Sequence, residues 1–244
     1  MESIVRLDKY LVYQPKIDLN TLEIIGLEAL VRFLEPNSNK NLSTESVINS
    51  ISSIEEMVLL TSYVIDRVIL DMKKLDKLGW NGNISINMSP REICNTNLYN
   101  LLEERFRTDK IYGNRIEIEI TEKHEIEDAE CMKERISLLK KLGISIAIDD
   151  LGAGFNKKEL IQEYNVDMVK IDRSFVRNFY NKKEELDYII DISKKKNIKL
   201  LIEGIELEED LKRFRKLGIE FGQGYLFYKP VDIKEIIEII IKQK

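Results

Sequence analysis

The sequence predicts an α/β fold, a TIM-like (β/α)8 barrel whose first strand runs antiparallel to its neighbour. Short apolar segments alternate with segments of helical periodicity along the chain, which is the pattern of a parallel barrel. The turn residues Asn20 and Thr21 separate the first two extended segments, and so short a link cannot make a parallel crossover. Four prolines and no stretch rich in proline, glycine and serine indicate that residues 1–244 form a single domain.

Eight extended segments make up the expected barrel. The opening pair covers residues 10–19 and 22–33, which are rich in the Ile, Val, Leu and Tyr side chains that favour strands. The other expected strands cover residues 83–89, 115–121, 144–150, 166–172, 198–204 and 219–224.

Amphipathic helices are expected between these strands. The longest follows a cap signal at residues 43–47 and keeps helical periodicity from residue 54 to Gly79. The further expected helices cover residues 99–107, 128–143, 157–164, 184–197, 208–218 and 232–243.

Charge and hydropathy restrict the classes of partner. The net charge is -5, so a broad electrostatic grip on polymeric nucleic acid is not expected. A small anionic substrate is still compatible with this charge if metal ions supply the positive counterpart. No stretch approaches the ~20 apolar residues of a membrane span, and the N-terminus lacks the apolar segment of a signal peptide. No association with a membrane is therefore expected.

Cysteine and histidine usage narrows the chemistry. Cys94 and Cys131 are spaced for neither zinc ligation nor a disulfide framework, which indicates a reducing, cytoplasmic location. His124 is the only histidine, so a histidine-rich zinc or di-iron site is excluded. Any bound metal would need oxygen ligands, which suit magnesium, manganese or calcium.

Polar residues gather at the C-terminal ends of the predicted strands, where the active sites of such barrels lie. Each alone has a simpler interpretation, because an acid after a strand usually caps the next helix, and a lysine can extend its charge from an apolar stem. Alternation over residues 115–121 also predicts Glu119 at the barrel mouth and Glu117 in solvent. The residues at the strand ends are Glu28, Asn87, Glu119, Glu122, Asp149, Asp150, Lys170, Asp172, Glu203 and Gln223.

Together, these strand-end residues predict a two-metal carboxylate site with a lysine nearby. Carboxylates gathered at one mouth repel one another, and without cations this repulsion raises their pKa values and costs stability. The adjacent pair Asp149 and Asp150, followed directly by a glycine-rich turn, is the strongest single instance of this pattern.

The same residues stand in motifs that resemble those of the EAL-domain phosphodiesterases, which hydrolyse the bacterial second messenger cyclic di-GMP. The family's signature resembles Glu28-Ala29-Leu30-Val31-Arg32, and further motifs follow in the family's order over essentially the whole chain. The matching motifs are Tyr13-Gln14-Pro15, Asn87-Met88-Ser89, Glu119-Ile120-Thr121-Glu122, Asp149-Asp150, Lys170 in VKIDRSFV, Glu203 in EGIE and Gln223 in QGYLF.

The resemblance implies hydrolysis of cyclic di-GMP to linear 5′-pGpG with two Mg²⁺ or Mn²⁺ ions per site, and inhibition by Ca²⁺. Asp149 resembles the residue that bridges the two ions. Asp150 and Glu203 resemble residues that serve the second ion directly or through water. The implied metal ligands are Glu28, Asn87, Glu119, Asp149, Asp150 and Glu203.

The resemblance also implies roles in catalysis and substrate binding. Lys170 resembles the residue that orients or deprotonates the attacking water, and Glu122 resembles the glutamate that anchors the loop after Asp150. The implied catalytic residues are Lys170, Glu28, Glu122, Glu203 and Gln223, and the implied substrate contacts are Gln14, Arg32 and Asp172.

The loop after Asp150 departs from the family pattern. The family usually reads DDFGTGYSSL, whereas this chain reads DDLGAGFNKK, so that Asn156, Lys157 and Lys158 replace two small polar residues and a packing leucine. In the family this loop supports the second metal and leads into a dimerisation helix, so a homodimer is also implied. Two alternatives to catalysis stay open: a receptor that binds cyclic di-GMP without hydrolysing it, and a protein-interaction module that has lost the ligand.

Overall fold

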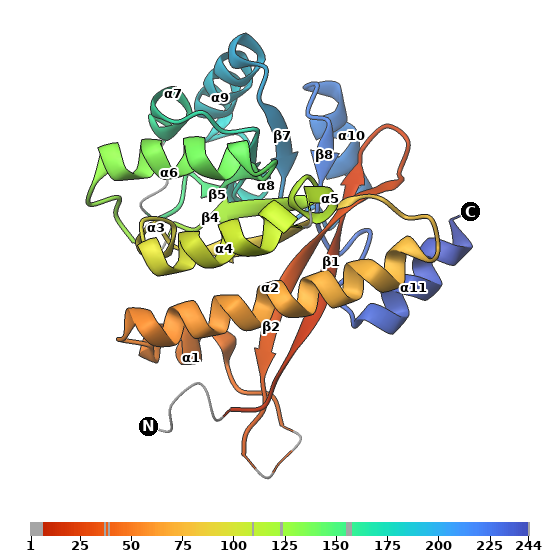
Figure 1. Cartoon of the computed structure of the whole chain (residues 1–244). Coiled ribbons are helices and arrows are strands. Elements are labelled where there is room, and N and C mark those ends of the chain that lie inside the picture. Colours follow the sequence, from red (N-terminus) through yellow and green to blue (C-terminus); the bar gives the residue numbers. More distant parts are fainter. Residues whose placement is uncertain are drawn as a thin grey trace.

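Eight strands close into one barrel in the computed structural model, which describes residues 7–36, 38, 40–108, 110–122, 124–154 and 158–243. The strands follow one another around the barrel in sequence order (Figure 1). β1 pairs antiparallel with both β2 and β8, and the other neighbouring pairs are parallel, so the predicted fold is confirmed. The strands are β1 Lys9–Asp18, β2 Ile24–Phe33, β3 Asn83–Met88, β4 Ile116–Ile120, β5 Ser145–Leu151, β6 Met168–Ile171, β7 Lys199–Ile202 and β8 Phe221–Gly222.

The turn between β1 and β2 lies at the expected turn residues. Asp18 Oδ1 accepts hydrogen bonds from the backbone N–H groups of Asn20 (2.7 Å) and Thr21 (3.1 Å), a local turn that aspartate side chains favour. Leu22 completes the reversal with a φ of 63°. The resulting long hairpin brings Gln14 of β1 opposite Glu28 of β2.

The expected helices are present, and side-chain caps set several of their starts. The Ser53 side chain accepts a hydrogen bond from the backbone N–H of Glu56 at the start of α2. At the start of α6, the Asp128 side chain accepts one from the backbone N–H of Cys131. The helix expected at residues 157–164 is only the single turn α7. The helices are α1 Thr44–Ser50, α2 Ile54–Asp76, α3 Pro90–Ile93, α4 Thr96–Thr108, α5 Lys110–Gly113, α6 Ala129–Lys141, α7 Leu160–Glu163, α8 Ser174–Arg177, α9 Lys183–Lys196, α10 Glu208–Lys216 and α11 Ile233–Lys242.

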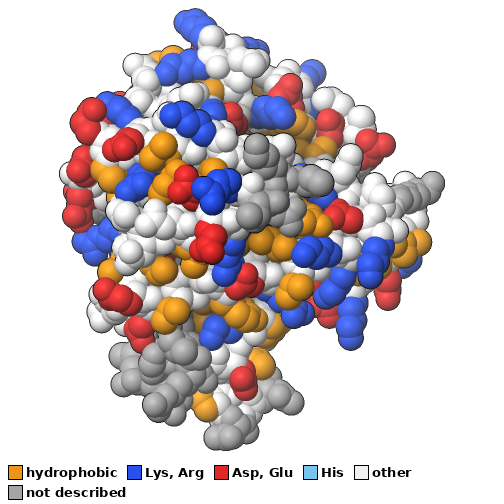
Figure 2. Space-filling model, in the orientation of Figure 1, with side chains coloured by type: hydrophobic (Ala, Val, Ile, Leu, Met, Phe, Trp, Pro, Cys, Tyr) orange, Lys and Arg blue, Asp and Glu red, His pale blue; other side chains and the backbone are white. Residues whose placement is uncertain are grey.

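The surface carries charges of both signs. Figure 2 shows Lys and Arg side chains interspersed with Asp and Glu on the face that it draws. Over the part of the chain that the structure describes, no helix combines the length and the apolar character that crossing a bilayer requires.

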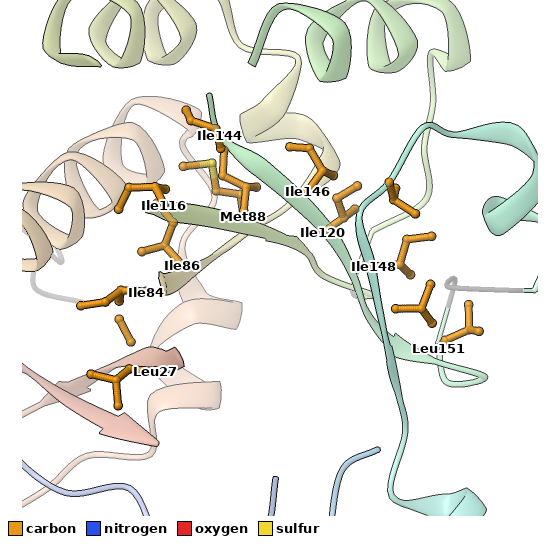
Figure 3. Close-up of a cluster of buried hydrophobic side chains, with 14 of the residues drawn as sticks. Leu27, Ile84, Ile86, Met88, Ile116, Ile120, Ile144, Ile146, Ile148 and Leu151 are labelled. Atoms are coloured by element: carbon orange, nitrogen blue, oxygen red, sulfur yellow. The ribbon is translucent and has the colours of Figure 1, made fainter. Parts of the chain in front are cut away.

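Apolar side chains on the outer face of the barrel form the main core. Figure 3 shows part of this cluster, with Ile84 and Ile86 of β3 near Ile116 of β4. Ile118 and Ile120 of β4 belong to the same cluster, which also includes side chains of the covering helices. Because side chains alternate across a strand, the residues between these isoleucines face the barrel interior.

The barrel interior is charged as well as apolar. Lys16 of β1 is 3% exposed, and its Nζ lies 2.5 Å from Glu117 Oε1 and 2.6 Å from Glu119 Oε1. Glu117 is only 4% exposed, so the expectation that it faces solvent was wrong. The reason is that both faces of a barrel strand are covered, and a buried cation from the antiparallel strand compensates the inward carboxylates.

Replacing Lys16 by methionine is expected to destabilise the fold strongly. The substitution keeps the apolar stem but leaves Glu117 buried without its cation, at an expected cost of about 3–5 kcal/mol in the free energy of unfolding. Urea denaturation of metal-free protein measures this cost. The double variant Lys16→Met/Glu117→Gln removes the unpaired charge and should recover a substantial part of the loss. A Lys16→Met protein within 1 kcal/mol of the parent would contradict the compensating role of this ammonium.

Candidate metal centre

One buried ammonium stands at the centre of the polar cluster predicted from the strand ends. Lys170 of β6 is 1% exposed, and it is surrounded by carboxylates on β2, β4 and β5 and by the one directly after β7. The Lys170 Nζ lies 2.6 Å from Asp149 Oδ1, 2.7 Å from Glu203 Oε1, 2.9 Å from Glu119 Oε2 and 3.4 Å from Glu28 Oε2. A single positive charge therefore faces four acids that strand geometry forces together.

Two amides complete the cluster and leave oxygen atoms free. Asn87 Nδ2 donates to Glu28 Oε1 at 3.0 Å, and Gln223 Nε2 donates to Glu28 Oε2 at 2.9 Å. The other amide atoms, Asn87 Oδ1 and Gln223 Oε1, are buried without a hydrogen-bond partner among the described residues. Unpaired buried oxygens beside clustered carboxylates are a donor set that a hard divalent cation fits.

The chain turns sharply at Asp150, and this turn brings two adjacent aspartates to one site. Asp150 has a φ of 44°, and the register between β5 and β6 shifts between Ile148 and Leu151. Side chains of successive strand residues normally point to opposite faces, but here Asp149 contacts Lys170 while the Asp150 carboxyl is hydrogen-bonded to Glu203. Left-handed backbone is tolerated by aspartate and costs free energy, which is typical of residues held in place for function.

The loop after Asp150 is packed closely against Glu122. Gly154 has a φ of 50°, and a Cβ atom added there would lie 2.7 Å from the Glu122 carbonyl oxygen and 2.8 Å from its Cγ. Carboxylate oxygens of Glu122, Asp149 and Asp150 all lie within 4.8 Å of one another. Glu122 is therefore placed both to hold this loop and to add negative charge beside the two aspartates.

The substituted part of this loop lies mostly outside the described residues. The structure does not describe residues 155–157. The expectations for Asn156 and Lys157 therefore lie outside the described residues. Lys158 is described, and its Nζ lies 5.1 Å from the centre of the Tyr188 ring.

Burial and mutual repulsion shift the pKa values of the acids in the cluster. Burial, with the charge of Asp149 added, raises the pKa of Asp150 to about 7. Burial likewise raises the pKa of Glu203 to about 8 and holds that of Asp149 well above its usual range, although Lys170 opposes both shifts. Protons therefore remain on part of the cluster near neutral pH when no metal is bound.

Two residues of the cluster remain charged because each faces opposite charges. Burial alone would raise the pKa of Glu119, but the ammonium groups of Lys16 and Lys170 outweigh it and lower the pKa to about 2. Burial alone would lower the pKa of Lys170, but Asp149, Glu119 and the other acids hold it well above its usual value. Lys170 is therefore a hydrogen-bond donor in this arrangement.

A cavity of about 310 Å³ opens from the acids toward α1 and α2. The backbone and side chains of residues 28–32 form one wall, and Arg32 lies in it with its Nη1 donating to the Val31 carbonyl at 2.9 Å. Apolar side chains of α1 and α2 form the opposite wall, namely Ile48, Met57, Leu60 and Val64. One end of the cavity is thus acidic and the other apolar, which suits a ligand with a charged group and a flat apolar part.

Two of the predicted substrate contacts lie outside the lining of this cavity. Gln14 Nε2 donates to the Tyr228 carbonyl at 3.3 Å. Asp172 Oδ1 accepts from the backbone N–H of Ser174 at 2.9 Å, which is a local turn that aspartate side chains favour, and Arg173 is the cap residue of α8. The structure therefore places Arg32 in the cavity lining and leaves Gln14 and Asp172 out of it.

Sequence reasoning missed three residues near the site. Lys16 lies beneath Glu119, while Glu92 and His124 line the cavity. Burial raises the pKa of Glu92, whose Oε1 accepts from Thr61 Oγ1 at 2.5 Å. Glu92 also completes a capping box with Ser89, and the spacing S-x-x-E after a strand is the sequence signal that could have found it.

Comparison with known proteins identifies the family. The family model described as EAL domain matches residues 2–230. The probable cyclic di-GMP phosphodiesterase PdeN of Escherichia coli (strain K12) is 26% identical over 246 residues, covering 99% of this chain and 47% of that protein. The cyclic di-GMP phosphodiesterase PdeA of Borreliella burgdorferi is 29% identical over 212 residues, covering 85% of this chain and 31% of that protein. The chain thus spans less than half the length of these two relatives.

Solved structures agree with this result. The EAL enzyme Bd1971, in a form with cAMP and cyclic di-GMP bound, superposes with a TM-score of 0.83 at 29% identity, over 95% of this chain and 64% of that one. An EAL domain protein from Listeria monocytogenes EGD-e superposes with a TM-score of 0.83 at 25% identity, over 97% of this chain and 94% of that one. The barrel, its ring of acids around one lysine and the match over residues 2–230 together show that this chain belongs to the EAL domain family.

Proposed function

We propose that this chain hydrolyses cyclic di-GMP to linear 5′-pGpG in a metal-dependent reaction. The observation that carries the proposal is the cluster of four carboxylates around Lys170, at the barrel end where the cavity opens. Relatives named as cyclic di-GMP phosphodiesterases support the choice of substrate, as does the cyclic di-GMP-bound form of Bd1971.

The donor set fits two divalent cations that share one carboxylate. When bound, such ions neutralise charge on the phosphate and make a water molecule easier to deprotonate. The Asn87 Oδ1 oxygen, which has no other partner among the described residues, is free to serve as a ligand. Asp149 contacts Lys170 and lies within 4.8 Å of Asp150, so it would be the carboxylate shared by the two ions. We assign Glu28, Asn87, Glu119 and Asp149 to the first ion, and Asp149, Asp150 and Glu203 to the second.

Protein side chains would orient the reactants. Lys170, kept protonated by its acids, donates hydrogen bonds into the cluster and can hold the attacking water, which favours orientation over proton abstraction. Arg32 lies in the cavity wall, and a guanidinium can hold a phosphate through two parallel hydrogen bonds. Gln223 lies beside Glu28 and offers its free Oε1 to a water in the same space.

A receptor function is the second candidate, because the changes around Lys158 fall in the loop that leads from Asp150. In that case the chain binds cyclic di-GMP and leaves it intact. Calorimetric titration of cyclic di-GMP with nucleotide analysis of the same samples separates the candidates, since a receptor gives binding without pGpG. A chain that captures a protein partner in a pull-down, but neither binds nor hydrolyses cyclic di-GMP, would instead be an interaction module. A homodimer and a cytoplasmic location belong to this proposal as well, and light scattering of the purified chain tests the dimer.

Replacing Glu28 by glutamine is expected to reduce hydrolysis at least 100-fold, because an anionic ligand is lost while the side-chain shape is kept. Chromatographic measurement of pGpG formation with Mg²⁺ or Mn²⁺ gives the rate. Glu23→Gln, which removes an exposed carboxylate of the same chain, is the matched control and should keep the parent rate. A Glu28→Gln variant with more than a tenth of the parent rate would contradict the assignment of Glu28.

Metal exchange is expected to separate binding from turnover. Mg²⁺ and Mn²⁺ should support hydrolysis, whereas Ca²⁺ should occupy the same oxygen ligands and inhibit, because it activates water poorly and accepts looser geometry. Steady-state rates with each ion, and with Ca²⁺ added to Mg²⁺, measure this. Equal turnover with Ca²⁺ alone would rule out water activation as the role of the metal.

Metal affinity is expected to rise with pH. Below their pKa values of about 7 and about 8, Asp150 and Glu203 carry protons that a cation must displace. Raising the pH from 6 to 8.5 should therefore strengthen Mn²⁺ binding by at least about 10-fold, with release of protons at the lower pH. Calorimetry in buffers of different ionisation enthalpy measures both quantities. Glu203→Gln should flatten the dependence, and an equally flat dependence in the parent would contradict the assignment.

A further inference from the structure

The two cysteines of the chain lie side by side, although they belong to different elements. Cys94 follows α3 as its C-terminal cap residue, and Cys131 lies in the first turn of α6. These helices pack against each other, as Figure 1 also shows. The Cys94 thiol is hydrogen-bonded to Cys131, and both residues are free and partly exposed. Contact between the thiols meets the first requirement for a disulfide, which the spacing in the sequence does not reveal.

The surroundings of this thiol pair contain charges of both signs and a path for a small oxidant. Arg135 lies one turn beyond Cys131 on α6, and its charge acts on the Cys94 thiol against that of Asp128. The Arg135 Nη2 donates to Thr96 Oγ1 at 2.9 Å, while its Nε is buried without a partner among the described residues. Cys94 also lines a surface cavity of about 350 Å³. Cys94 is therefore open to a small oxidant from solvent, which is one requirement for a reactive cysteine.

The environments of the two sulfurs differ. Burial and the hydrogen bond to Cys131 raise the pKa of Cys94 to about 12. Cys131 lies in the first turn of α6, where its backbone N–H donates to the Asp128 carboxylate at 2.9 Å. Either sulfur can therefore be the first to react with an oxidant.

We propose that Cys94 and Cys131 form a reversible intramolecular disulfide when the protein is exposed to a peroxide. One of the two sulfurs attacks one peroxide oxygen and becomes a sulfenic acid, and the other oxygen leaves as water. The second cysteine sulfur then displaces the sulfenic hydroxyl, the S–S bond forms, and the proton of the second thiol leaves with that hydroxyl as a second water. Two thiols are oxidised and one hydrogen peroxide is reduced to two waters, and a dithiol reverses the reaction by exchange.

The disulfide would fix α3 against α6 beside the cavity of the metal centre. α3 carries Glu92, which accepts hydrogen bonds from Thr61 and Ser89 and lines that cavity. A covalent link closing the chain between Cys94 and Cys131 also restricts the unfolded state and stabilises the fold. The oxidised protein is therefore expected to melt at a higher temperature, by at least about 3 °C.

The test is a thiol count on the full chain, which does not depend on whether it hydrolyses cyclic di-GMP. Reduced protein is treated with hydrogen peroxide, denatured, alkylated and weighed by mass spectrometry. The expected product is a monomer about 2 Da lighter that takes up no alkyl groups, contains a cross-linked peptide pair and regains both thiols with dithiothreitol. Cys94→Ser and Cys131→Ser are the matched controls, and neither should give this monomeric product or the rise in melting temperature.

Three results would overturn the proposal. Parent protein that keeps two alkylatable thiols under both peroxide and the diazene oxidant diamide would show that the sulfurs do not join. Gains of oxygen mass on the cysteines in place of a cross-link, or disulfides only between chains, would show that the pair does not resolve internally. Parent protein that forms the bond without a higher melting temperature would overturn the restraint on α3.

Discussion

The contact between the Lys170 ammonium and four buried carboxylates is the constraint on which the rest of the site depends. The closed barrel brings carboxylates on β2, β4 and β5, and the one directly after β7, around Lys170 of β6. The four acids are therefore held close together. One cation compensates only part of that negative charge, and the raised pKa values of Asp150 and Glu203 show the remainder. The cluster therefore has a strong electrostatic demand for further positive charge, which is the property that a divalent metal centre needs.

The contacts of Glu119 show how the negative charge of the cluster is compensated within the fold. Its two oxygens are held from opposite sides, Oε1 by Lys16 and Oε2 by Lys170. Lys16 also pairs with the buried Glu117 carboxylate, so this one ammonium compensates charge on two interior glutamates. A buried pair of this kind adds little to stability compared with apolar packing, but removing one partner is costly. Its effect is to fix the Glu119 carboxylate in one orientation before any ligand arrives.

Much of this arrangement could be predicted from the sequence, because the order of the strands and the residues at their ends can be recognised from local sequence patterns. Acids at the ends of successive parallel strands had to meet, and they do so around Lys170. What could not be predicted depends on which face of a strand turns inward and on which helices touch. Alternation alone does not say whether Glu117 or its isoleucine neighbours face the interior when both faces are buried, and nothing in the spacing of Cys94 and Cys131 shows that their thiols meet. Asp172 looks the same in sequence whether it stabilises a local turn or contacts a substrate, and the structure shows the turn contact with Ser174.

Anomalous diffraction from crystals grown with Mn²⁺ tests the central claim most directly. The account predicts two anomalous peaks about 3.5–4 Å apart. Asp149 should lie between them, with Glu28, Asn87 and Glu119 around one peak and Asp150 and Glu203 around the other. No peak inside this cluster, with Lys170 still in contact with all four carboxylates at saturating Mn²⁺, would contradict the account.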